Sequence, residues 1–180
     1  MQSSLSQLLV AEHDIILEAG NLISLNRSQW KSNPSAYKQT VNQLLDFFSV
    51  YADHFHHHKE EEILFPAISK KSEIAGAGII FELIEHHEEF RQLMQQIRTT
   101  LDNNDFASTQ QFLESYISIL KDHIAAENDE LFPMAEDIFS KDELDKLYYK
   151  CIDKDWDLGI IHKEEMENLI NKLQSNEAVQ

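Results

Sequence analysis

The stretch DHFHHHKEEEILFP, at residues 53–66, is the most informative part of this chain about its fold. It places a histidine and a glutamate four positions apart, His56 and Glu60, ahead of a Leu-Phe-Pro triplet. A second stretch, DHIAAENDELFP at residues 122–133, repeats the pattern with His123, Glu127 and another Leu-Phe-Pro, at one constant offset and without a gap. The chain therefore contains two related halves, each with one histidine–glutamate pair.

A shorter motif precedes each of these stretches. Glu12-His13 lies ahead of the first stretch, and Glu85-His86 lies ahead of the second. Residues four apart on an α-helix share one face, so the histidine and the glutamate of each pair can reach a single point beside their helix. Each half is therefore expected to be a pair of helices, both of which carry a histidine toward the same centre.

Helical periodicity extends over most of the chain. The 180 residues include only four glycines and three prolines, so few positions interrupt a helix. We predict an all-α fold, an antiparallel up-and-down four-helix bundle with one or two extra C-terminal helices. Residues 1–140 are expected to form the bundle, and residues 141–180 a C-terminal helical extension packed on the same domain.

Local signals predict where the helices begin and end. The first helix is expected to end near Asn26, and Pro34 suits the first turn of the second. The third is expected to start at Ser72 and to fade in the polar stretch LDNNDF. The candidate N-caps are Ser4 or Ser6 for the first helix and Asp105 or Ser108 for the fourth.

The charge and the cysteine content argue against several classes of partner. A formal net charge of -17 disfavours binding to nucleic acid or to an anionic membrane. Cys151 is the only cysteine, which excludes an intramolecular disulfide and a thiolate metal cluster. The start of the chain lacks the pattern of a signal peptide, and no stretch approaches the roughly 20 apolar residues that span a bilayer. We therefore expect a cytoplasmic protein.

A set of histidines and glutamates on the expected buried faces predicts a metal site. An ionised glutamate is costly to bury without a cation or strong hydrogen bonds. Mixed imidazole and carboxylate ligation suits iron, manganese or zinc. A lone inward histidine is more often a hydrogen-bonded core residue, but the repeat favours ligation for the set as a whole. The predicted ligands are His13, His56, Glu60, His86, His123 and Glu127.

The neighbouring histidines are assigned differently. Adjacent positions of an α-helix point in different directions, so most of His54, His57 and His58 are expected to face solvent. His87 is expected at the periphery of its helix, since it precedes Arg91. Three further glutamates are expected as outer carboxylates around the ligands, namely Glu61, Glu62 and Glu130.

These motifs, in this order, resemble the hemerythrin-like (HHE cation-binding) family. The resemblance is carried by EHD at 12–14, HHHKEEEILFP at 56–66, EHHEE at 85–89 and DHIAAENDELFP at 122–133, and it covers about residues 5–139. It implies two non-haem iron ions, joined by an oxo or hydroxo bridge, in a four-helix bundle. The same positions imply terminal ligation by His13, His56, His86 and His123, and bridging by Glu60 and Glu127.

One position departs from the oxygen-carrying members of that family. Those members have another histidine one turn after the third-helix ligand, where this chain has Phe90. Fewer histidines leave more coordination positions for a small ligand such as O2 or NO. Ferritin-like bundles are set aside, because they place the glutamate three residues before the histidine.

Several functions follow from such a centre. The preferred hypothesis is a protein that binds or senses O2, NO or iron and passes the change to an unknown partner. One alternative is a di-iron oxidoreductase acting on O2, peroxide or NO, and another is an iron–sulfur repair or iron-handling protein. A structural bundle without metal is the last alternative. Zinc or manganese is also possible as the bound metal. No catalytic residue or dedicated proton donor is evident in the sequence, which favours binding over turnover.

Overall fold

A computed structural model describes residues 4–177, which are helical almost throughout and contain no strand. The all-α class is thereby confirmed. In this range no helix combines the length and the apolarity needed to cross a membrane. The elements, with η marking π-helices, are α1 (Leu5–Leu25), α2 (Gln29–Ser32), α3 (Pro34–Phe47), η1 (Phe48–His57), η2 (Glu60–Leu64), α4 (Phe65–Lys71), α5 (Glu73–Ala77), α6 (Ile79–Asp102), α7 (Phe106–Ala126), η3 (Glu127–Leu131), α8 (Phe132–Ile138), α9 (Lys141–Leu158) and α10 (Ile160–Glu177).

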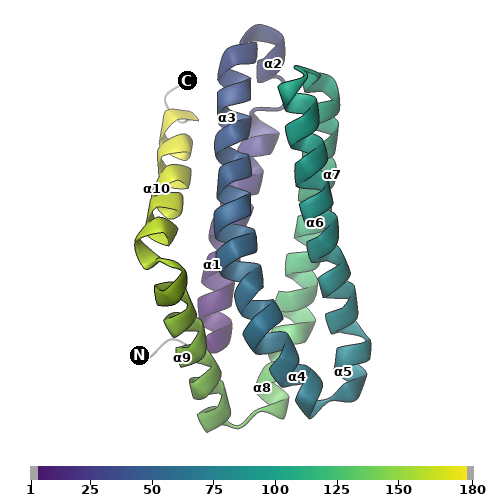
Figure 1. Ribbon diagram of the computed structural model, residues 1–180, viewed down its shortest axis with the longest axis vertical. Helices are drawn as coiled ribbons and strands as arrows, with labels where there is room; N and C mark the ends of the chain where they lie inside the picture. Colours follow the sequence, from purple (N-terminus) through teal and green to yellow (C-terminus); the bar gives the residue numbers. More distant parts are fainter. Residues whose placement is uncertain (1–3, 178–180) are drawn as a thin grey trace.

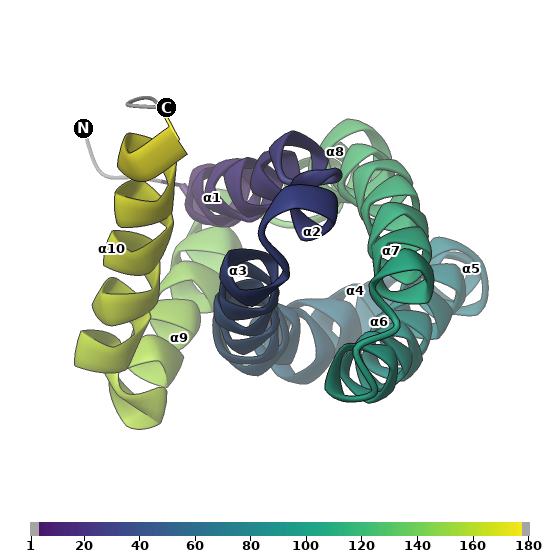
Figure 2. The same ribbon diagram turned by 90° about the horizontal axis from the view of Figure 1, so that it is seen from above.

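Four long helical segments lie side by side along the longest axis of the molecule (Figure 1). The first is α1, the second is the continuous run from α3 through η1 and η2 to α4, the third is α6, and the fourth runs from α7 through η3 to α8. The short helix α2 connects the first two segments at the top, and α5 connects the second and third at the bottom. Seen from above, the four segments surround a common interior (Figure 2).

Side-chain caps set several helix boundaries close to where the sequence predicts them, but the third long helix begins at Ile79, and Ser72 caps the short helix α5 instead. Ser4 caps α1, with its hydroxyl accepting the Gln7 N–H at 3.2 Å. Asp105 caps α7 by accepting the Ser108 N–H, also at 3.2 Å. Pro34 occupies the first position of α3, where its missing N–H costs no hydrogen bond. Of the candidate caps, Ser4 and Asp105 are therefore the ones used, because their side-chain oxygens accept from a free N–H of the first helical turn.

The two Leu-Phe-Pro triplets each follow a turn of π-helix. The Phe65 N–H donates to the Glu60 carbonyl, five residues back, and Phe132 makes the same bond to Glu127. The residue after each phenylalanine is a proline, which has no N–H and whose ring clashes with the carbonyl four residues earlier. Because this proline blocks the α-helical bond, the wider hydrogen-bonded turn is favoured just before it. The sequence repeat is thus also a repeat of backbone geometry.

A layer of histidine and glutamate side chains separates two apolar clusters in the interior. The cluster above the layer contains residues such as Ile16, Phe48 and Leu120. The cluster below it contains residues such as Leu9 and Leu131. Burial of both clusters drives the association of the segments and holds the polar layer between them at a fixed depth.

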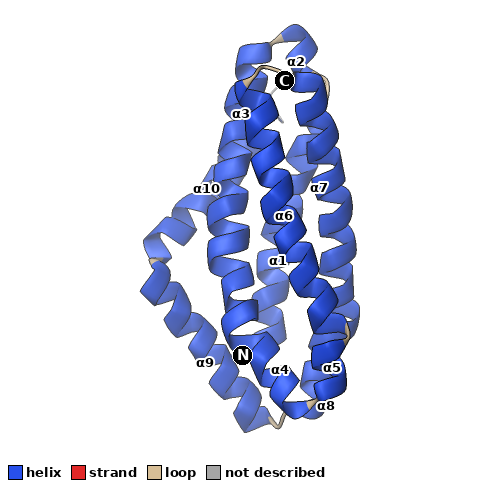
Figure 3. Cartoon of the chain, turned by 45° about the vertical axis from the view of Figure 1, so that its right-hand side comes forward, coloured by secondary structure: helices blue, strands red, loops and turns tan. Residues whose placement is uncertain are grey.

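The C-terminal helices α9 and α10 pack against α1 and the second segment (Figure 2). They meet at an angle (Figure 3), where Gly159 ends α9 with a φ of 105°, in the left-handed region that favours glycine. Cys151 of α9 and Ile170 of α10 are fully buried and belong to the lower and upper clusters respectively. The extension therefore contributes to the same interior as the four long segments.

Candidate metal centre

Seven side chains converge in the polar layer, and none of them is more than 2% exposed. They form two groups, and within each group the potential ligand atoms lie within 4.8 Å of one another. Glu60 belongs to both groups. The His13 group consists of His13, His56, Glu60 and Glu127, and the His57 group consists of His57, Glu60, His87 and His123.

The His13 group brings two imidazoles against two carboxylates. The Nε2 atom of His13 lies 3.1 Å from Oε2 of Glu127. The Nε2 atom of His56 lies 3.4 Å from Oε1 of Glu60, one helical turn away on the same segment. Each histidine thus points one ring nitrogen at a carboxylate from the layer, as the spacing of the motifs predicts.

The opposite ring nitrogens in this group are held by hydrogen bonds. Nδ1 of His13 lies 2.9 Å from Oδ1 of Asn128, and Nδ1 of His56 lies 2.8 Å from Oε2 of Glu12. A carboxylate or an amide oxygen can only accept, so the proton of each neutral ring is on Nδ1. The lone pair of each Nε2 is then directed into the layer, which is the arrangement that a metal ligand needs.

The His57 group places two imidazole nitrogens face to face. Nε2 of His87 lies 3.2 Å from Nε2 of His123 and 3.6 Å from Oε2 of Glu60. Nδ1 of His87 donates to Oε1 of Glu61 at 2.7 Å, so its Nε2 carries a lone pair. Nε2 of His123 also lies 3.3 Å from Oε2 of Glu127, which places Glu127 beside both groups.

Most of the potential metal-ligand atoms in the layer are buried and have no hydrogen-bond partner. Buried polar atoms in folded proteins nearly always have one, so a convergent set without partners calls for an explanation. Nitrogen lone pairs and carboxylate oxygens that offer no hydrogen are complementary to a cation. The donor set therefore fits a metal ion. The unpartnered atoms that face one another are Nε2 of His13 and His56 and both carboxylate oxygens of Glu60 and Glu127. The Nδ1 atoms of His57, His86 and His123 are also buried without a hydrogen-bond partner.

Burial shifts the protonation of these groups toward their neutral forms. It lowers the pKa of His56 to about 3 and lowers the pKa of His57 and of His123 well below the usual range. Burial also raises the pKa of Glu60, as does the nearby Glu127, and it raises the pKa of Glu127 itself. Burial thus keeps the imidazoles of His56, His57 and His123 neutral, while the two carboxyls need a cation beside them to be stable as carboxylates.

The structure brings together five of the six residues predicted as ligands, and it places His86 in neither group. His87 from the next position is in the His57 group and is fully buried, so its expected peripheral position is wrong. His86 and His87 each lie three or four positions from the buried residues Leu83 and Phe90, so the helical spacing allows either histidine to point inward. His86 lies beside the site, its ring centroid 5.6 Å from that of His123.

His57 is the second residue that the sequence argument missed. Most of His54, His57 and His58 are expected to face solvent, and His54 is exposed and His58 partly exposed, but His57 is buried beside His56. A π-helix holds more residues per turn than an α-helix, so successive side chains differ less in direction, and η1 turns both His56 and His57 inward. The ring of Phe90 stacks on His57 with centroids 5.8 Å apart.

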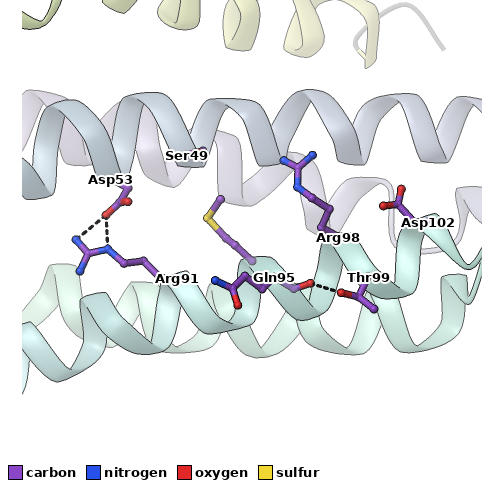
Figure 4. A pocket seen from close by; sticks show the side chains of 8 residues that line it. Ser49, Asp53, Arg91, Gln95, Arg98, Thr99 and Asp102 are labelled. Carbon is purple, nitrogen blue, oxygen red and sulfur yellow. Dashed lines mark hydrogen bonds and ion pairs between the residues drawn. The ribbon is translucent and has the colours of Figure 1, made fainter.

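Arg91 holds the carboxylates behind the His57 group. It donates to Oδ1 of Asp53 at 2.9 Å and to Oε1 of Glu61 at 2.7 Å. The same Glu61 oxygen accepts from His87, and the same Asp53 oxygen lies 3.5 Å from Nδ1 of His57. Figure 4 shows Arg91 facing Asp53 at one end of a groove of about 560 Å³ between the second segment and α6. The residues that hold the His57 group by hydrogen bonds and ion pairs, Arg91, Asp53 and Glu61, therefore lie on a partly exposed side of the molecule.

Comparison with known protein families supports cation binding by this chain. Residues 4–135 match the hemerythrin HHE cation binding domain, a range that contains both ligand groups and ends within α8. Searches of curated proteins and of solved structures gave no match. The match covers more than half of the chain. This chain belongs to the hemerythrin HHE cation-binding domain family.

Proposed function

We propose that the protein holds a non-haem centre of two iron ions and uses it to bind or sense O2 or NO. The observation that carries the proposal is the convergence of buried, unpartnered imidazole nitrogens and carboxylate oxygens in two adjoining groups. Two groups that share Glu60 suit two ions bridged by a carboxylate. The family supports cation binding, and the identity of the ions and of the small ligand is our proposal.

The ligand roles follow from the grouping. His13 and His56 would hold one ion, and His57, His87 and His123 would hold the other. Glu60 and Glu127 would bridge them, since Glu127 lies 3.1 Å from His13 and 3.3 Å from His123. This set replaces His86 with His87 and adds His57 to the ligands implied by the family resemblance.

The two ligand groups contain different numbers of histidines, which favours binding of a small ligand to the ion that has fewer of them. The ion of the His13 group would have two imidazoles and the other ion three, so the first would keep more of its coordination positions free. Imidazole and carboxylate donors suit iron, manganese and zinc alike. Iron would supply the redox change and the affinity for O2 and NO that zinc lacks, which is why a sensing function requires it.

The surroundings of the layer favour a small uncharged ligand over a large substrate. The ring of Phe132 stacks on His13 at 5.6 Å, and Phe65 stacks on His87 at 5.8 Å. Phe90 packs edge-on against His123 at 5.3 Å. These apolar rings exclude water and leave the ligand atoms enclosed, so a diatomic gas is a better fit than a polar metabolite.

The proposal includes the finer features expected from the sequence. We infer that the four segments are antiparallel neighbours, because short connections at alternating ends join them in Figure 1. We infer one domain, with residues 1–140 as the bundle and 141–180 as its packed extension, of which residues 1–3 and 178–180 lie outside the described part of the chain. The net charge of -17 supports a protein without nucleic-acid or membrane partners, and the single, buried cysteine is compatible with the cytoplasm as its location.

Metal analysis combined with spectroscopy tests this function. The protein would be purified without a histidine tag, and its metals per chain measured by mass spectrometry. Absorption spectra would be recorded in air, after anaerobic reduction, and after addition of O2 or NO to the reduced form. We expect about two irons per chain, matching the two ligand groups, and an absorption that bleaches on reduction and changes again with the gas.

The alternatives give different results in the same experiment. Zinc with a featureless spectrum would move the function to metal handling or structural support. Repeated consumption of a reductant together with O2, peroxide or NO would establish an oxidoreductase. A folded protein that takes up no metal would contradict the whole proposal.

A further inference from the structure

Four charged side chains form a buried cluster next to the His13 group. They come from four places in the chain: Glu12 from α1, Lys59 from the second segment, Asp155 from α9 and Lys163 from α10. Lys59 is fully buried, and the other three side chains are at most 7% exposed. We call this set the buried charge cluster.

The cluster is closed by short ion pairs. Lys163 Nζ lies 2.5 Å from Oε1 of Glu12 and 2.5 Å from Oδ2 of Asp155. Lys59 Nζ lies 2.9 Å from Oδ1 of Asp155 and also contacts Glu12. Two ammonium groups thus alternate with two carboxylates, and the formal charges balance.

Such a cluster is stable only as a whole. A buried ion that loses its partner keeps the cost of desolvation without the compensating attraction. Asp155 and Lys163 belong to α9 and α10, which lie beyond the matched family domain. Glu12 and Lys59 of the domain pair with each other, and the two C-terminal helices supply the second ion-pair partner of each.

Glu12 connects the cluster to a proposed metal ligand. Its Oε1 accepts from both lysines, while its Oε2 accepts from Nδ1 of His56 at 2.8 Å. Burial by itself raises the pKa of Glu12, but Lys59, His56 and Lys163 together lower it far below the usual range. The lysines thus fix both the charge and the orientation of the carboxylate that sets the tautomer of His56.

We propose that Asp155 and Lys163 are positioning residues for His56, and that metal binding is coupled to the docking of α9 and α10. The inference rests on the metal binding proposed above. The docked helices α9 and α10 orient Glu12, which in turn orients His56 toward the ion. Coupling between two binding events is reciprocal, so a bound ion must strengthen the docking of α9 and α10 by the same factor. The C-terminal helices are then the element through which the state of the centre reaches the surface.

A comparison of two substitutions tests the positioning role. Lys163→Met removes one ammonium of the cluster and keeps a similar side-chain length. The control is Tyr51→Phe, which removes a different contact to α10, the hydrogen bond from the Tyr51 hydroxyl to Glu167 at 2.9 Å. Both variants weaken contacts of α10, but only the first disturbs the path to His56.

The readout is the binding of Co2+ to the full-length, metal-free protein, followed by competition with a chelator and by the visible spectrum of the bound ion. We expect Lys163→Met to lower the affinity of one binding step by about 10- to 100-fold, the usual effect of losing a partner that orients a ligand, and to alter the spectrum. Tyr51→Phe should leave both unchanged. Equal affinity and spectrum in Lys163→Met and wild type would overturn the positioning role.

Hydrogen exchange of the wild-type protein tests the coupling and does not depend on the folding of a variant. With Co2+ bound, amides of α9 and α10 should exchange more slowly, and by a larger factor than those in the last turns of α6, far from the layer. Uniform slowing, or none in α9 and α10, would overturn the coupling. A wild-type protein that binds no Co2+ would overturn the proposed function together with this inference, whereas the other two outcomes leave that function intact.

Discussion

The imidazole rings of His57 and His87 lie stacked, with their centroids 3.9 Å apart and their planes 15° apart. They belong to η1 and α6, so the stack joins the second and third segments within the polar layer. Behind them, Asp53 and Glu61 face their Nδ1 atoms, and Arg91 holds both carboxylates. His57 and His87 each come from a run of adjacent histidines, at residues 56–58 and 86–87, and both belong to the candidate metal centre.

Substitution of His57 tests the contribution of the π-helical turn. His57→Ala should reduce the bound metal toward half of the wild-type content, because it removes one imidazole of the His57 group. It should also lower the free energy of unfolding by about 3 kcal/mol through the loss of a buried ring. Metal analysis and urea denaturation measure the two effects.

The neighbouring histidine supplies the control. His58 is 30% exposed and pairs with Glu62 at the surface, so His58→Ala should change neither metal content nor stability appreciably. Equal metal content in the two variants would contradict the assignment of His57 to the site.

The pair of His86 and His87 gives a second matched test. His87→Ala should lower the metal content and the affinity for the remaining ion, since Nε2 of His87 faces both His123 and Glu60. His86→Ala should retain metal, because His86 lies in neither ligand group. Loss of metal in His86→Ala with retention in His87→Ala would restore the ligand set expected from the sequence.

Glu61 should support the site without touching the ions. Glu61→Gln removes the charge that orients His87 and pairs with Arg91, so the metal affinity should fall by about 10-fold or more. The adjacent Glu62 pairs with Lys154 at the surface, and Glu62→Gln should bind metal as the wild type does. Chelator competition on both variants measures the difference, and equal affinities would count against a role for Glu61.

The stability of the metal-free protein should decrease as the pH rises from about 7.5 to 8.5. Burial raises the pKa of Glu127 from 4.5 to about 8, so in this window the folded protein holds a proton that the unfolded chain has released. The free energy of unfolding should then fall by about 1.4 kcal/mol per pH unit for each such proton. The buried histidines have lowered pKa values and oppose this decrease near pH 6.5, where the unfolded chain is still partly protonated, but they add little above about pH 7.5, where they are neutral in both states.

Metal binding should remove this dependence, since an ion displaces the proton from the carboxyl. Urea denaturation at several pH values between about 7.5 and 8.5, with a chelator and with saturating Zn2+, makes the comparison. A metal-free protein whose stability is constant or rises across the window would show that the two glutamates are not protonated when the ions are removed.

The all-helical class and the histidine–glutamate pairs could be predicted because they depend on local spacing. His56 with Glu60, and His123 with Glu127, come together through one helical turn, whatever the rest of the chain does. The caps at Ser4 and Asp105 are equally local. For these features the relevant contacts lie within a few residues of each other along the chain.

The choice between adjacent residues required the tertiary structure. Periodicity places a helix face only to within about one residue, so it could not separate His86 from His87. It also assumes α-helical geometry, and the π-helical turn that buries His57 departs from this geometry. The buried charge cluster had no signal in the sequence, because its residues lie far apart along the chain and are brought together only by the packing of α9 and α10 on α1.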